Sequence, residues 1–212
     1  MEQHNTVMYN YIEFQSNGAC FKKETSDFII EFPKQNIKFE LFSIQKNDCK
    51  LVATLEKDEH SREYLEPQFI RIKDMSTNRT VLKDFVVYEN LSHGVDLAFH
   101  VFNHIIDEML TIREGVKNCI ISYSIQYSNL IWKYHAAEKK IMFYNAHNHC
   151  KVFNVPLTYT IEDKEIDPNH MEISIKHMSN NRLVLHIEVD ISRISNLKFC
   201  SPITLHRQLI IE

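Results

Sequence analysis

Short segments in which apolar and polar residues alternate recur along the whole chain, and this period of two constrains the fold more than any other feature. In the segment 37–44, Ile37, Phe39 and Leu41 share one face, and charged residues lie between them. Such alternation is typical of a half-buried strand. Six more segments are similarly rich in β-branched and aromatic residues: 68–73, 80–88, 119–127, 171–177, 182–189 and 203–211. Turn sequences such as STNR and SNN separate them, so we expect mainly antiparallel β-sheet.

The segment from about 92 to 114 departs from this period and predicts an amphipathic helix. Ser92 suits the N-cap and Gly115 suits a left-handed stop. Packed on a sheet, this helix would make an α+β, sandwich-like domain. The apolar residues recur at three- and four-residue steps: Val95, Ala98, Val101, Phe102, Ile105, Met109 and Ile112.

Length and composition favour one domain without a bound cofactor. A chain of 212 residues is long enough for a sizeable core, and we expect residues 1–212 to form a single domain with a weak seam near residue 90. Only three glycines accompany thirteen Phe and nine Tyr, which disfavours glycine-rich phosphate loops.

Charge and cysteine content favour an intracellular protein that does not contact nucleic acid directly. The net charge is −4 and the basic residues are not clustered, whereas binding to a phosphate backbone needs clustered Lys and Arg. The sequence shows no secretory signal and no apolar run of roughly 18 residues. Five irregularly spaced cysteines indicate reduced thiols. We expect a cytoplasmic or nuclear location, with membrane contact that is peripheral at most.

The segment FYNAHNHCKVFNVP, residues 143–156, holds the candidate site residues His147, His149 and Cys150. Zinc needs four ligands, and no rule of spacing brings His135 or His170 to complete the set. A reactive thiol needs a helix N-terminus or fixed positive charge, and the sequence places neither beside Cys150. The expected structure is a turn between two strands. The sequence therefore predicts no catalytic residue and no metal site, with these three side chains as the remaining candidates.

The predicted helix carries a polar stripe of Asp96, His100, His104 and Glu108 at four-residue steps. A metalloprotease helix needs Glu directly after the first His, and Val101 stands there. We therefore expect a solvated face stabilised by side-chain pairs. The sequence also has no nucleophile elbow, phosphate loop or dinucleotide fingerprint, so an enzyme is not expected.

Residues 90–178 resemble the central region of rhabdovirus matrix proteins. The order of SHGVDLAFHVFNHIIDEML, REGVKN, CIISYSIQYSNL, HNHC, NVP and MEISIKHM carries the resemblance. It implies a compact α+β domain that self-associates, condenses the nucleocapsid and bridges it to a membrane and a glycoprotein tail. The chain lacks a lysine-rich amino-terminal arm and motifs that recruit budding machinery, and it ends in a strand-like segment. Of the properties that the resemblance implies, self-association is therefore the one that we expect this chain to share.

Three functions remain open from the sequence. The leading hypothesis is a non-enzymatic structural or interaction protein, matrix-like, that self-associates and binds protein partners. The first alternative is a monomeric β-sandwich module that binds a peptide or a small ligand. The second alternative is a Cys/His or metal-dependent enzyme that uses His147, His149 or Cys150.

Overall fold

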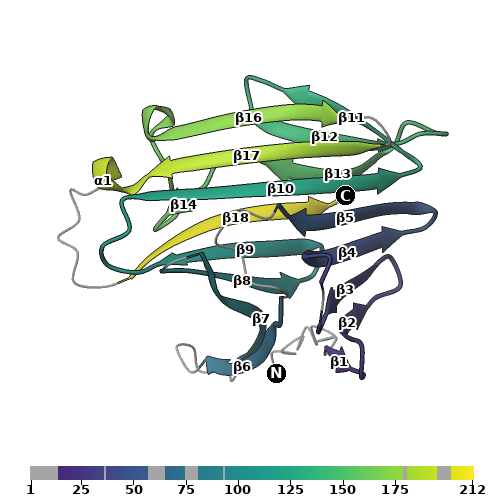
Figure 1. Cartoon of the computed structure of the whole chain (residues 1–212). Helices are drawn as coiled ribbons and strands as arrows, with labels where there is room; N and C mark the ends of the chain where they lie inside the picture. Colours follow the sequence, from purple (N-terminus) through teal and green to yellow (C-terminus); the bar gives the residue numbers. More distant parts are fainter. Residues whose placement is uncertain are drawn as a thin grey trace, which may run out of the picture.

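Two antiparallel sheets dominate the computed structural model (Figure 1), which describes residues 14–35, 37–56, 65–74, 81–92, 94–178, 181–194 and 202–212. Sheet A has the strand order β1 (Gln15–Ser16), β2 (Cys20–Glu24), β3 (Ile29–Pro33), β4 (Glu40–Lys46), β5 (Cys49–Leu55), β10 (Asn118–Ser128), β17 (Arg182–Asp190) and β16 (Met171–Met178). Sheet B has the order β11 (Leu130–His135), β12 (Lys140–Asn145), β13 (Lys151–Pro156), β18 (Ile203–Ile211), β9 (Ile105–Ile112), β8 (Val95–Phe102), β7 (Val81–Ser92) and β6 (Gln68–Asp74).

Small elements complete the described part of the chain. The strands β14 (Thr160–Ile161) and β15 (Lys164–Glu165) pair with each other, and β14 also pairs with β18. The helical elements are the 3-10 turn η1 (Pro168–His170) and the four-residue helix α1 (Ile191–Ile194). Within the described residues no helix has the length and apolar character needed to cross a membrane.

The two sheets share one hydrophobic core. Side chains at every second position are buried along the central strands, as on β8, because successive residues of a strand point to opposite faces. The ring centroids of Phe42 on β4 and Phe99 on β8 lie 5.1 Å apart. The Tyr88 hydroxyl on β7 donates to the carbonyl of Leu41 on β4 at 2.6 Å. These contacts join sheet A to sheet B.

All seven segments predicted as strands from their alternation contain strands in the structure. The strands β16 and β17, which flank the turn sequence SNN, pair antiparallel up to Met178 and Arg182. The predicted seam near residue 90 falls within β7, and the single-domain organisation stays a prediction.

The predicted helix at 92–114 is wrong, because this segment contains the hairpin of β8 and β9. Asn103 has a φ of 49°, a left-handed conformation that Asn tolerates and that a tight hairpin turn needs. Both strands bury alternate residues against the core. The apolar residues that predicted the helix lie on both faces of this hairpin, so their three- and four-residue steps had no structural meaning. The fold is therefore mainly antiparallel β, and the described residues contain one short α-helix.

Candidate functional site

Two residues of opposite charge face each other on the core side of sheet B. Glu108 on β9 and Arg207 on β18 are direct cross-strand partners. Arg207 Nη2 lies 2.5 Å from Glu108 Oε2, and the two side chains are only 7% and 8% exposed. Burying two charges is costly unless their hydrogen bonds are made. The buried residues are mainly apolar, and this ion pair is, with Lys23 and Asp84, among the few buried charged groups of the described residues.

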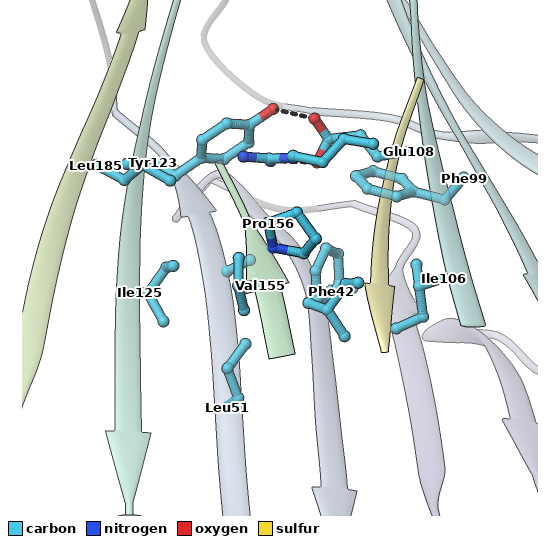
Figure 2. Close-up of a pocket in the computed structure, with 13 residues that line it drawn as sticks. Phe42, Leu51, Phe99, Ile106, Glu108, Tyr123, Ile125, Val155, Pro156 and Leu185 are labelled. Carbon is cyan, nitrogen blue, oxygen red and sulfur yellow. Dashed lines mark hydrogen bonds and ion pairs between the residues drawn. The ribbon is translucent and has the colours of Figure 1, made fainter. Parts of the chain in front are cut away.

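Two tyrosines complete the surroundings of the ion pair. The hydroxyls of Tyr123 on β10 and of Tyr159, just before β14, both donate to Glu108 Oε1, at 2.9 and 2.5 Å. The guanidinium carbon of Arg207 lies 4.9 and 5.1 Å from the centroids of the same two rings, within reach of a cation–π interaction. Figure 2 shows the bond between Tyr123 and Glu108. The guanidinium is thus held by the carboxylate and by both aromatic faces.

The protonation states of this cluster follow from its burial. Burial raises the pKa of Tyr123 and of Tyr159 well above the usual value, so both hydroxyls keep their protons and act as donors. Burial, the largest single effect, lowers the pKa of Arg207, but the Glu108 carboxylate together with Tyr159 and Tyr123 more than offsets it, and the pKa is raised overall. The guanidinium therefore stays charged.

One donor of this cluster has no partner. Arg207 Nη1 is buried and makes no hydrogen bond to any described residue. Arg207, Glu108 and Tyr123 line a cavity of about 30 Å³ (Figure 2), whose apolar wall includes Leu51, Ala53, Phe99, Ile106, Ile125 and Leu185. One ordered water needs roughly 10–15 Å³ of such space. The cavity therefore has room for ordered water or for the head group of a small ligand.

Sheet B is interrupted beside the cavity. The ladder between β13 and β18 contains only the pairs Phe153↔Ile211 and Asn154↔Ile210. Pairing along this side of β18 resumes at Thr160↔His206. The five residues 155–159 therefore run opposite the three residues 207–209 without ladder pairs. Pro156 suits this position, because a proline has no N–H to donate to a ladder.

This interruption marks where the cavity approaches the surface. Of the thirteen residues that line the cavity, eleven are buried. The two partly exposed ones are Pro156 on β13 and Leu209 on β18, on either side of the interruption. We therefore locate the mouth of the cavity between β13 and β18.

The residues singled out from the sequence lie elsewhere, in the turn between β12 and β13. His147, His149 and Cys150 are exposed, and Asn145 Oδ1 accepts the backbone N–H of His147 at 2.8 Å. The prediction that this segment is a turn between two strands is confirmed. His149 has a φ of 58°, so the alternation of faces expected in a strand does not apply to it. In the part of the chain that the structure describes, no three His, Cys, Asp or Glu side chains are grouped to hold a metal ion.

The same turn is fixed to its neighbours by polar contacts. Asn145 Nδ2 lies 3.2 Å from Asp48 Oδ1 and 3.1 Å from Cys49 Sγ. His147 Nε2 lies 3.9 Å from Asp48 Oδ2.

Burial raises the pKa of the Cys49 thiol and raises the pKa of the Cys119 thiol on β10 to about 12. Both thiols are therefore protonated at neutral pH, a state that suits packing more than nucleophilic attack.

The residues of the cavity were missed or misplaced by the sequence reasoning. Glu108 was expected on a solvated helix face, and this is wrong because it is buried in the core. Arg207 was not singled out. One signal could have found both residues: each is the only charged residue at an inward position of its strand, between Ile106 and Leu110 on β9 and between Leu205 and Leu209 on β18.

No protein-family model, no curated protein and no solved structure significantly matches the chain. The resemblance of residues 90–178 to rhabdovirus matrix proteins therefore stays a prediction. The segment that opens the resemblance, expected as a helix, contains the hairpin of β8 and β9.

Proposed function

We propose that the protein is a non-enzymatic β-sandwich binding module for a small ligand, seated in the cavity between the two sheets. The observation that carries this proposal is Arg207 Nη1, which is buried and has no partner among the described residues, on a residue that lines a cavity with mainly apolar walls. Ligand sites typically combine apolar walls with a few fixed polar groups. A buried donor without an acceptor costs free energy, which a bound ligand would recover.

The contacts around Arg207 support a binding role. Glu108, Tyr123 and Tyr159 hold the guanidinium by an ion pair and by ring contacts. A ligand that reaches Nη1 would therefore meet a donor that is already in place, and such preorganisation lowers the entropy lost on binding. Apolar pairs of similar volume are often as stable as a buried ion pair, so stability alone gives no reason for this one.

Filling the cavity tests the proposal. The full chain and its Ala53→Leu variant are screened by thermal unfolding against a panel of organic molecules with a few heavy atoms each. We expect some of these molecules to stabilise the wild type, by about 2.7 kcal/mol at 100 times their Kd. Ala53→Leu adds three carbons to the cavity wall and should abolish the stabilisation. The matched control is Val52→Leu, at the neighbouring position of β5 outside the cavity lining.

Two results would contradict this function. One is stabilisation of Ala53→Leu by the same molecules and to the same extent as the wild type. The other is a wild type that no small molecule stabilises.

A second candidate is the self-associating interaction protein that was the leading hypothesis from the sequence. Among the described residues, four of the six exposed large hydrophobics lie on β6 and β11: Ile70, Ile72, Ile131 and Tyr134. These are the two outermost strands of sheet B, and exposed apolar edges favour pairing with another chain. The edges of sheet A differ, since β1 has two residues and β16 exposes Glu172 and Lys176. The broader matrix-like bridging role rests on the resemblance alone.

A further inference from the structure

We infer that the ligand is a neutral, largely apolar molecule that presents one carbonyl-type acceptor to Arg207 Nη1. This inference rests on the proposed function and specifies the chemistry of its ligand. It follows from the hydrogen-bonding inventory of the cavity, from its charge balance and from the position of its mouth.

The free hydrogen-bonding capacity of the cavity is that of a donor. The protons of Tyr123 and Tyr159 are both donated to Glu108 Oε1, and Glu108 Oε2 accepts from Arg207 Nη2. Arg207 Nη1 remains without a partner among the described residues, and a guanidinium nitrogen can only donate. The ligand group beside it must therefore be an acceptor.

The charge balance favours a neutral acceptor. Arg207 and Glu108 carry opposite charges in direct contact, so the ion pair has no net charge. A carboxylate ligand would add a second negative charge next to Glu108 in a buried site, where an uncompensated charge is strongly disfavoured. A ketone, ester or amide carbonyl accepts the same hydrogen bond and adds no net charge.

Size and position define the rest of the ligand. About 30 Å³ takes a carbonyl group and its nearest substituents. The apolar wall around it, including Phe99, Ile125 and Leu185, suits hydrocarbon substituents. Any longer part would leave between Pro156 and Leu209, at the interruption between β13 and β18. The carbonyl thus enters first, and the apolar tail follows.

Three molecules of nearly the same shape separate the possible chemistries. 2-Butanone carries a neutral carbonyl, 2-methyl-1-butene replaces the oxygen by CH₂, and propanoate replaces the methyl group by a charged oxygen. Each is titrated into the full chain, and the methyl NMR resonances of Ile106, Ile125 and Leu185 report binding in the cavity. We expect saturable shifts with 2-butanone, an affinity roughly tenfold or more weaker for 2-methyl-1-butene, as one net hydrogen bond implies, and weaker binding of propanoate because of its buried charge.

Two variants test the named residues. Arg207→Lys keeps a positive charge beside Glu108 but removes the second guanidinium nitrogen, so the preference for 2-butanone over 2-methyl-1-butene should disappear. Leu209→Phe narrows the mouth and should slow or abolish entry of 2-butanone. Ile210→Phe is its matched control, because this neighbouring residue does not line the cavity. The Leu209→Phe comparison keeps the inference testable if Arg207→Lys does not fold.

Each outcome bears on the inference. Equal binding of 2-methyl-1-butene and 2-butanone by the wild type would overturn the carbonyl chemistry and leave the binding module standing. Tighter binding of propanoate would overturn the neutral charge. Absence of shifts at these methyl groups with all three probes would overturn both the inferred ligand class and the proposal that this cavity binds a ligand.

Discussion

Glu108 accepts hydrogen bonds from Tyr123 of sheet A, from Arg207 of sheet B and from Tyr159, just before β14. One carboxylate therefore links both layers at the cavity. Because its partners are buried with it, removing its charge leaves the positive charge of Arg207 without compensation. Breaking a buried ion pair in this way is far more costly than replacing both partners.

We expect Glu108→Gln to lower the free energy of unfolding by about 3–5 kcal/mol, as measured by urea denaturation. The double variant Glu108→Gln with Arg207→Met should lose less than Glu108→Gln alone, because it contains no uncompensated charge. Glu165→Gln on the exposed β15 is the control and should change stability by less than about 0.5 kcal/mol. A loss below about 1 kcal/mol for Glu108→Gln would contradict the role of this ion pair.

At the scale of elements, the hairpin of β8 and β9 shows why periodicity alone misled. The inward residues of the two strands include Leu97, Phe99, Ile106 and Leu110, and a helix would place Leu97 on the side opposite the other three. Their outward neighbours are also often apolar, and this produced apparent three- and four-residue steps. The left-handed turn at Asn103 and pairing with β7 and β18 select the hairpin.

The exposed edge of β11 leads to a prediction at the same scale. If the edges of sheet B mediate self-association, Ile131→Lys should weaken it, because a charge at an edge opposes pairing with a second strand. Sedimentation velocity over a concentration series measures this, and the variant should lose the concentration dependence of the wild type. Ile131 is 45% exposed.

The matched control is Ile120→Lys, since Ile120 is 52% exposed but lies on β10, an interior strand of sheet A. This variant should behave as the wild type does. A wild type that sediments as a monomer at every concentration would remove the self-association candidate, as would equal effects of the two variants.

At the scale of the whole molecule, His100 makes folding stability depend on pH. Burial is the main reason that the pKa of His100 is lowered. Lys23 and Lys83 lower it further, while Asp107 and the backbone carbonyl of Asp84, which lies 2.9 Å from Nδ1, raise it. The unfolded chain therefore binds a proton at a higher pH than the folded protein does. The resulting stability is complete above the unfolded pKa of about 6.5 and is lost as the pH falls through the folded pKa.

We expect the free energy of unfolding to decrease as the pH falls from 7 to 5, with a smaller decrease in His100→Asn. Asn keeps a donor near the position of Nδ1 but does not titrate. Urea denaturation at each pH provides the measurement, and the exposed His147→Gln is the control. The same pH dependence in His100→Asn and in the wild type would show that other groups cause it.

The sequence by itself determined the positions of the seven strands that were predicted from their alternation, since alternation within a segment is a local property. It also predicted the turn that holds His147 and His149, because the flanking strands and the polar residues between them are local too. Tertiary structure alone decided the choice between helix and hairpin at 92–114, because that choice depends on the strands available for pairing. The tertiary structure also decided which residues form the candidate site. Glu108 and Arg207 are 99 residues apart in the chain, and only the register of β9 with β18 brings their charges together beside a cavity.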